Sequence, residues 1–203
     1  MIQKQSSLTD AVVITGASTG IGEACAIYLD KLGYQVFAGV RKKIDGDALR
    51  QKASERLIPI FLDVTDETSI RAAANTVNEI LGTAKLVGLV NNAGIAIAGV
   101  LEFLPIAELR KQLEVNVIGQ IAVTQAFLPL LRKAQGRIIN ISSESGKISS
   151  PFMGAYCASK FALEALTDAL RIELQPWEIQ VSLIEPGIII TPIWEKSLAK
   201  ADD

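Results

Sequence analysis

The chain has 203 residues, 49% of them hydrophobic, which suits a single domain with a sizeable core over residues 1–203. Its formal net charge of −2 leaves no broad basic surface, so nucleic acid is not an expected partner. Without histidine a Ser-His-Asp triad is impossible, and with two cysteines a zinc site would need an unusual set of carboxylates, so we expect no metal site.

Short runs of β-branched residues alternate along the chain with longer segments of helical periodicity. This alternation predicts an α/β fold, a doubly wound Rossmann-type parallel sheet with helices on both faces. Right-handed crossovers then give the strand order 3-2-1-4-5-6, with ligands bound beyond the carboxyl ends of the strands, near the point where the order reverses. The predicted strands are residues 11–15, 35–40, 57–62, 86–90, 137–141 and 180–184, and the predicted helices are residues 20–32, 45–55, 67–81, 106–133 and 154–175.

A glycine-rich loop follows the first predicted strand and leads into a helix. Its glycines are spaced GxxxGxG, which lets the backbone turn tightly and approach a pyrophosphate at the positive end of the helix dipole. A plain turn is the alternative, and the strand before and the helix after favour the phosphate site. The candidate cofactor-binding residues here are Gly16, Ser18, Thr19, Gly20, Ile21 and Gly22.

The second predicted strand ends in three cations, Arg41, Lys42 and Lys43, with no carboxylate among them. In a dinucleotide-binding fold an acid at this point bonds a free 2′-hydroxyl, whereas a basic residue meets a 2′-phosphate. The pattern therefore favours NADP(H) over NAD(H), with Arg41 as the main contact of the 2′-phosphate. A solvated basic turn is the alternative, and Thr19 adds no second positive charge in the glycine loop.

Tyr156 and Lys160 are four residues apart on a predicted helix, so their side chains share one face. A nearby ammonium favours the phenolate, so we expect the pKa of Tyr156 to lie below its usual value of about 10. A serine at the end of the preceding strand could hold a substrate oxygen while Tyr156 exchanges a proton. Taken alone, such a pair usually lies on an exposed helix face and has no functional role.

Together these residues resemble the short-chain dehydrogenase/reductase family. The ordered match covers nearly the whole chain, and it consists of the loop at 15–22, Asp63-Val64, Asn91-Asn92-Ala93-Gly94, Asn116, Ser143, the Tyr156-xxx-Lys160 pair, and Pro186-Gly187 with Thr191. Such an enzyme moves hydride between a nicotinamide and a carbonyl or secondary alcohol.

The resemblance implies roles for these residues. Ser143, thirteen residues before Tyr156, would be the catalytic serine, and Asn116 would bind a water that relays protons from Lys160. Lys160 would also hold the nicotinamide ribose. Asp63 would bond the adenine amino group, with Val64 nearby, and Asn91 would line the adenosine side, although a polar turn is the alternative for Asn91 and Asn92. The remaining expected cofactor contacts are Ala93, Gly94, Pro186, Gly187 and Thr191.

Within the family, the segments around Tyr156 and Pro186 resemble the retinol and hydroxysteroid dehydrogenase branch. That branch makes lipidic ketones, steroids or retinoids one option for the substrate. The family's lid and seventh strand follow the sixth strand, and we expect both to be missing here, because residues 194–203 leave no room for them. Two alternatives remain: a catalytically weak cofactor-binding regulator or scaffold, and an epimerase or dehydratase, which would need a longer chain.

The polar start of the chain, MIQKQSSLTD, and the polar residues that interrupt its later apolar stretches favour a soluble, cytoplasmic protein without a membrane span. Cys25 and Cys157 lie in helix-like segments and are interpreted as small buried hydrophobic residues. The segments 106–133 and 154–175 carry apolar residues on more than one face, and with the family resemblance they predict a homodimer or homotetramer.

Overall fold

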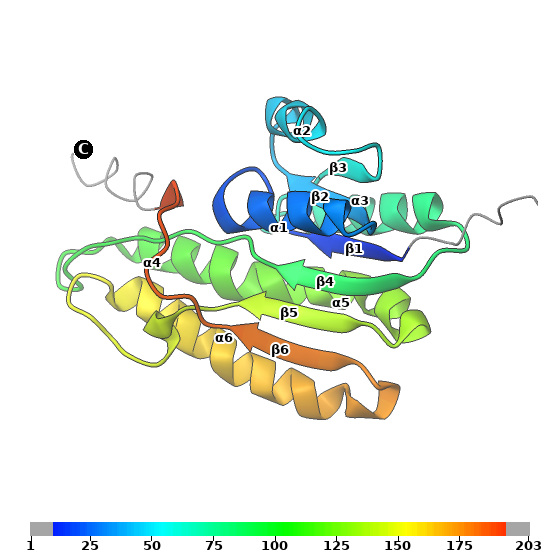
Figure 1. Cartoon of the computed structure of the whole chain (residues 1–203). Helices are drawn as coiled ribbons and strands as arrows, with labels where there is room; N and C mark the ends of the chain where they lie inside the picture. Colours follow the sequence, from blue (N-terminus) through cyan, green and yellow to red (C-terminus); the bar gives the residue numbers. More distant parts are fainter. Residues whose placement is uncertain (1–9, 194–203) are drawn as a thin grey trace, which may run out of the picture.

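The computed structural model describes residues 10–193, which form a six-stranded parallel sheet with helices on both faces (Figure 1). The strand order β3-β2-β1-β4-β5-β6 confirms the predicted doubly wound topology. Each strand lies within one residue of its predicted bounds, because each is a short apolar run bounded by polar or glycine residues. The strands are β1 (Ala11–Ile14), β2 (Gln35–Val40), β3 (Leu57–Phe61), β4 (Leu86–Asn91), β5 (Arg137–Ile141) and β6 (Gln180–Ile184).

Six α-helices connect the strands, and two of the five predicted helices depart clearly from them. The second begins and ends earlier than residues 45–55, because the buried carboxylate of Asp30 accepts hydrogen bonds from the backbone and hydroxyl of Ser54 and draws the chain out of the helix. The expected helix 106–133 is divided by a π-helical turn. The helices are α1 (Gly20–Lys31), α2 (Lys43–Arg50), α3 (Glu67–Leu81), α4 (Ile106–Leu113), α5 (Gly119–Ala134) and α6 (Gly154–Glu173), with the π-helical turn η1 (Glu114–Ile118) between α4 and α5.

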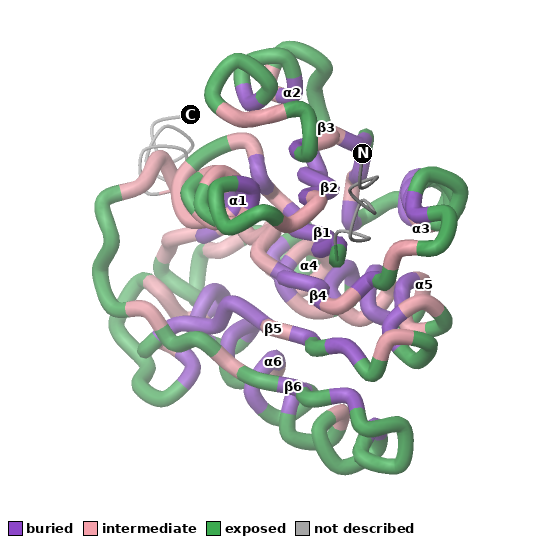
Figure 2. The backbone as a smooth tube through the Cα atoms, turned by 45° about the vertical axis from the view of Figure 1, so that its right-hand side comes forward, coloured by how far each residue is buried: buried purple, intermediate pink, exposed green. Residues whose placement is uncertain are grey.

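The core lies on both sides of the sheet. One apolar cluster joins the sheet to α3 and α5, where Phe37, Val77 and Phe127 are fully buried. The other joins the sheet to α1 and α2 around Ala26 and Leu49. Figure 2 shows the central strands as buried along most of their length. Burial on both faces explains why these strands read as continuous apolar runs instead of alternating ones.

The helical stretch Ile106–Ala134, which contains α4, η1 and α5, is long and apolar enough to cross a membrane by length and composition alone. Core helices of soluble proteins pass the same test. Here Gln120 and Thr124 of α5 are buried, and α5 packs against β4. The stretch therefore serves as a covering helix of the sheet.

Some expectations stay predictions after the fold is known. The outer face of α6 exposes Phe161, Leu166 and Ile172, but whether it pairs with a second copy of the chain is untested. The strand β6 lies at the edge of the described sheet. The expected lack of a lid and a seventh strand concerns residues 194–203, which lie outside the described residues.

Candidate active site

The glycine loop between β1 and α1 turns sharply at two glycines. Gly16 and Gly20 have φ angles of 64° and 62°, in the left-handed region that favours glycine. A Cβ on Gly16 would lie 2.7 Å from the Cα of Ala93, and a Cβ on Gly20 would lie 3.2 Å from Thr191. No side chain caps the start of α1 at Thr19. The two glycines thus let the loop turn sharply and pack closely against Ala93 and Thr191, and the start of α1 keeps backbone N–H groups that can bond an anionic group, so these residues fit the pyrophosphate of a dinucleotide.

The same loop is bonded to the segment that follows β4. The hydroxyl of Thr15 accepts hydrogen bonds from the backbone N–H groups of Asn92 and Ala93 at 3.0 and 2.9 Å. In return, Nδ2 of Asn92 donates to the carbonyl oxygens of Thr15 and Gly16 at 2.9 and 3.0 Å. The strand order reverses between β1 and β4, so these bonds fix the two sides of the predicted ligand crevice to each other.

The ends of β2 and β3 present the predicted adenosine-side residues. Arg41, Lys42 and Lys43 are all exposed, and no carboxylate within residues 10–193 pairs with them. Asp63 is half-buried, and its Oδ1 accepts from the backbone and hydroxyl of Thr65. The site therefore combines an exposed cationic corner with one ordered carboxylate.

Ser143, Tyr156 and Lys160 come together at the carboxyl end of β5. Ser143 follows that strand and begins the short 3₁₀ turn η2 (Glu144–Gly146), whose Ser145 N–H it caps at 3.1 Å. Tyr156 lies on the first turn of α6 and forms a side-chain hydrogen bond with Ser143. The Nζ atom of Lys160 donates to the carbonyl of Ile141 at 2.8 Å and lies 5.6 Å from the centre of the Tyr156 ring.

The electrostatics of this pair differ from the sequence-based expectation. Burial raises the pKa of Tyr156 above its ordinary value, and the hydrogen bond with Ser143 only opposes that rise. Burial also lowers the pKa of Lys160 to about 8, against a smaller opposing effect of Glu164. The expected fall in the pKa of Tyr156 is therefore wrong for this structure, because removing the phenol from water outweighs its hydrogen bond with Ser143.

Asn116 lies in η1, where it is fully buried. Its Oδ1 accepts from the backbone N–H of Ile95, and its Nδ2 donates to the Ile95 carbonyl and to the hydroxyl of Ser159. Because these bonds occupy both ends of the side chain, a relay water at this residue would have to be held by its backbone carbonyl. That water stays a prediction.

Asn91 lies apart from the other candidate residues. Its side chain is 1% exposed, and its Nδ2 donates to Thr124 of α5 at 2.8 Å and to Asn140 of β5 at 2.9 Å. Asn140 continues the chain of bonds to Thr167 of α6. The structure therefore does not bring the Asn91 side chain to the adenosine side, as the sequence had indicated, but uses it to join the sheet to two helices.

The segment after β6 runs back across the site towards the start of α1 (Figure 1). The carbonyl of Pro186 accepts from the backbone N–H of Glu144, next to Ser143, at 3.1 Å. Further along, Thr191 lies over Gly20 of the glycine loop. Pro186 thus lies beside the Ser143 turn and Thr191 beside the glycine loop, and the expected cofactor contacts of Pro186, Gly187 and Thr191 stay predictions.

Val64 is buried, and a Cβ on Gly119 would lie 2.5 Å from its carbonyl oxygen, so Val64 packs against the start of α5. Gly94 lies beside the side chain of Asn116.

Three buried polar residues around the site were not predicted. Gln112 bonds the backbone of Ile95 and Ile97, Ser159 accepts from Asn116, and Glu164 is buried one turn after Lys160. The signal that could have identified them is a polar residue on a helix face that is otherwise apolar.

Together the site holds a phenol, a hydroxyl and an ammonium at the same sheet edge as the glycine loop, which suits proton exchange with an oxygen of a bound substrate.

Comparison with known proteins gives a family match. The family described as short chain dehydrogenase matches residues 10–202. Retinol dehydrogenase 5 of Mus musculus is 43% identical over 183 residues, 90% of this chain and 57% of that protein. The 17-beta-hydroxysteroid dehydrogenase type 6 of Bos taurus is 46% identical over 199 residues, 96% of this chain and 62% of that protein. The chain therefore spans less than two thirds of the length of these relatives.

Two solved structures share the fold closely. The 3-ketoacyl-(acyl-carrier-protein) reductase from Brucella melitensis complexed with NADH has a TM-score of 0.87 and 28% identity, with coverage of 93% of this chain and 80% of that one. The structure of ElxO with NADP bound has a TM-score of 0.86 and 29% identity, with coverage of 96% and 80%.

Proposed function

The chain belongs to the short-chain dehydrogenase/reductase family, and on that premise we propose that it is an oxidoreductase that moves hydride between a nicotinamide cofactor and a carbonyl or alcohol. One observation carries this proposal. Ser143, Tyr156 and Lys160 lie together at the carboxyl end of β5, and the segment after β6 bonds the turn after Ser143 and then packs on the glycine loop.

The bound nicotinamide would supply or accept the hydride, and the protein positions the substrate and handles the proton. Residues of the glycine loop would hold the pyrophosphate, and Lys160 the nicotinamide ribose. The hydroxyl of Ser143 donates a hydrogen bond to the substrate oxygen, and the phenol of Tyr156 gives that oxygen a proton or takes one from it. The ammonium of Lys160, held by the Ile141 carbonyl, stabilises negative charge on the phenol.

The preferred cofactor is NADP(H) in this proposal. Arg41 and Lys42 stand exposed at the end of β2 without a carboxylate partner in the described chain, and guanidinium and ammonium groups bind a 2′-phosphate through charge-assisted hydrogen bonds. The Arg41→Ala variant should weaken NADPH binding about tenfold and leave NADH binding unchanged. A wild-type protein that binds NADH more tightly than NADPH contradicts this preference.

The proposed substrate is an apolar alcohol or ketone. The names of the relatives refer to retinol and to a hydroxysteroid, and the segment after Gly187 presents the exposed side chains of Ile188 and Ile190 beside the site. A panel that pairs long-chain, steroidal and retinoid carbonyls with small polar ones tests this choice. Turnover confined to the small polar carbonyls would contradict it.

The decisive experiment measures NADPH and NADH binding by calorimetry and then follows cofactor oxidation with the carbonyl panel. Tyr156→Phe, which removes only the phenolic hydroxyl, is compared with Tyr28→Phe, which makes the same change at an exposed site on α1. We expect Tyr156→Phe to bind NADPH normally and to lose about 10³-fold in kcat, and Tyr28→Phe to behave as wild type. Binding without turnover in the wild type would instead support a cofactor-binding regulator.

A further inference from the structure

A buried carboxylate lies one helical turn beyond Lys160. Glu164 is four residues further along α6, so the two side chains are neighbours on the same helix face. Glu164 is 7% exposed and Lys160 is 5% exposed. Burying a single charge is costly, and the cost falls when an opposite charge is buried beside it. Each of the two buried charges therefore lowers the cost of burying the other.

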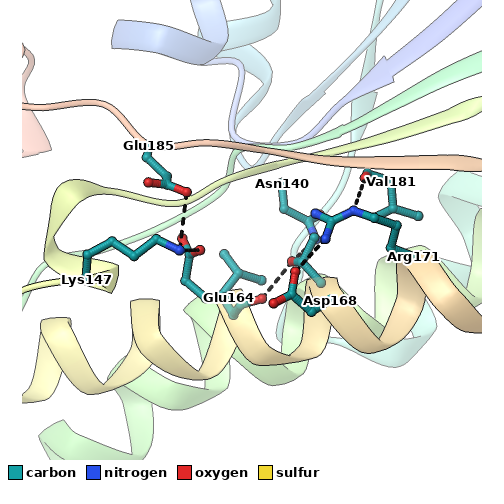
Figure 3. A network of polar contacts seen from close by, with 9 residues as sticks. Asn140, Lys147, Glu164, Asp168, Arg171, Val181 and Glu185 are labelled. Carbon is teal, nitrogen blue, oxygen red and sulfur yellow. Dashed lines mark hydrogen bonds and ion pairs between the residues drawn. The ribbon is translucent and has the colours of Figure 1, made fainter.

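Glu164 also forms an ion pair with a half-exposed lysine. Its Oε2 forms an ion pair with Nζ of Lys147 at 2.7 Å, and the same Nζ lies 3.5 Å from a carboxylate oxygen of Glu185 (Figure 3). Lys147 follows the η2 turn that begins after Ser143, and Glu185 is the first residue after β6. Among the described residues the ion pair of Glu164 is with Lys147, so its charge acts on Lys160 along the helix face and not through direct contact.

The fold makes room for this carboxylate. A Cβ on Gly146 would lie 3.0 Å from both Cγ and Oε1 of Glu164, and 3.0 Å from the hydroxyl of Ser142. No hydrogen-bond donor reaches Oε1 in the described residues. Glycine at position 146 therefore gives the carboxylate its space, and Oε1 has no hydrogen-bond partner among the described residues.

We propose that Glu164 is a positioning residue of the active site, whose buried negative charge keeps the ammonium of Lys160 protonated where Lys160 must serve Tyr156. The inference rests on the proposed function, because it assigns Lys160 the role that function requires. Glu164 contacts neither substrate nor phenol and acts through Lys160. The proposed effect of Glu164 has the same direction as its influence on the pKa of Lys160, which burial lowers and Glu164 raises.

The charged and titratable groups around the pair come from three elements. On α6 they are Tyr156 and Cys157, which precede Lys160. From the η2 segment come Lys147 and Glu144, and from the segment after β6 comes Glu185. Of these groups, Lys147 opposes the effect of Glu164 on Lys160, because it is a second positive charge that shares the same carboxylate.

The test is a direct titration of Lys160 in the protein without cofactor, followed by the ¹³Cε resonance of labelled lysine and assigned with Lys160→Arg. In Glu164→Gln the midpoint should fall by about one pH unit relative to wild type. The matched control is Asp168→Asn, which removes a carboxylate one turn further along α6, where Asp168 pairs with exposed Arg171. The control should leave the midpoint unchanged.

A midpoint that is unchanged in Glu164→Gln, or that falls equally in Asp168→Asn, overturns the proposal. If Glu164→Gln does not fold, Lys147→Met decides instead. Removing the competing ammonium should raise the Lys160 midpoint, whereas an unchanged or lower midpoint would show that Glu164 serves the surface pair alone.

Activity gives a second and separate readout. The alkaline limb of the kcat profile should move to lower pH by about one unit in Glu164→Gln and stay in place in Glu164→Asp, which keeps the charge. Because the lysine titration needs neither cofactor nor turnover, its failure is distinguishable from failure of the proposed oxidoreductase function, which would appear as absent hydride transfer in the wild type.

Discussion

Both ends of the Asn116 side chain are bonded to the backbone of one residue, Ile95. Its Oδ1 accepts from the Ile95 N–H at 2.9 Å, and its Nδ2 donates to the Ile95 carbonyl at 2.9 Å. The same Nδ2 donates to Ser159, which lies between Tyr156 and Lys160 on α6. Asn116 therefore holds the segment after β4 and the catalytic helix in one arrangement, from a π-helical turn that widens the helix at this point.

Asn116→Ala should lower the free energy of unfolding by about 2 kcal/mol, because a buried backbone N–H loses its acceptor. The matched control is Gln112→Ala, which removes equivalent bonds to Ile95 and Ile97 but has no bond to α6. Urea denaturation should give similar losses for both variants. The kcat should fall about 10²-fold further in Asn116→Ala, and equal kcat losses would contradict the link through Ser159.

Ser142 and Ser143 are neighbours with opposite expected effects. The Ser142 hydroxyl is buried without a hydrogen-bond partner in the described residues, so Ser142→Ala should leave stability unchanged or raise it by about 1 kcal/mol. Ser143→Ala removes the hydroxyl that bonds Tyr156 and should lower kcat about 10²-fold. Steady-state kinetics and thermal unfolding of the two variants check this, and a larger kcat loss in Ser142→Ala would reverse the assignment.

Lys160→Met should unfold less readily than wild type at pH 7. The folded-state pKa of Lys160 is lowered from 10.5 to about 8, so between these values the folded state binds fewer protons than the unfolded state, and wild-type stability falls as pH falls towards 8. Replacing Lys160 removes the cost of burying its charge, but it also removes the hydrogen bond to Ile141. The net gain in the free energy of unfolding is about 1–2 kcal/mol.

The gain in Lys160→Met should shrink as the pH rises from 8 to 10. Urea denaturation at several pH values measures it, with exposed Lys31→Met of α1 as the control. Above pH 10 the raised pKa of Tyr156 lowers the stability of wild type and variant alike as the pH rises, because the folded state then keeps a proton that the unfolded state loses. A gain independent of pH would mean that packing, not charge burial, stabilises the variant.

Gly16→Ala should lower the free energy of unfolding by about 3 kcal/mol and abolish measurable cofactor binding. Its Cβ would lie 2.7 Å from the backbone of Ala93, at a positive φ that alanine disfavours. Gly33→Ala is the control, because Gly33 also has a positive φ but faces open space, so it should lose only about 1 kcal/mol and keep binding. Fluorescence titration with NADPH separates them, and equal effects would point to backbone strain alone.

The fold was predictable because its signals are local. Buried parallel strands read as short apolar runs, and the loops between them carry glycine or polar residues, so strands such as Gln35–Val40 and Arg137–Ile141 were predicted to the residue. The end of α2 was not, because it depends on Asp30 reaching Ser54 from another element. The π-helical turn at Asn116 likewise depends on a partner distant in the sequence, the backbone of Ile95.

The candidate site was predictable in its position more than in its energetics. Motif order identified the residues around the crevice, since the carboxyl ends of parallel strands share one edge. Spacing alone could not show that Asn91 faces the interior, or that burial raises the pKa of Tyr156. Burial and desolvation depend on the whole fold, and a local motif carries no information about them.

The contact between Thr191 and Gly20 joins residues near opposite ends of the described chain. Closing so long a loop costs conformational entropy, and this cost is offset only when the contacts of the rest of the sheet have formed. During synthesis the glycine loop leaves the ribosome early, but its cover arrives only when Thr191 has been made. A nascent chain that already holds β1 to β5 therefore still lacks the residue that packs on Gly20.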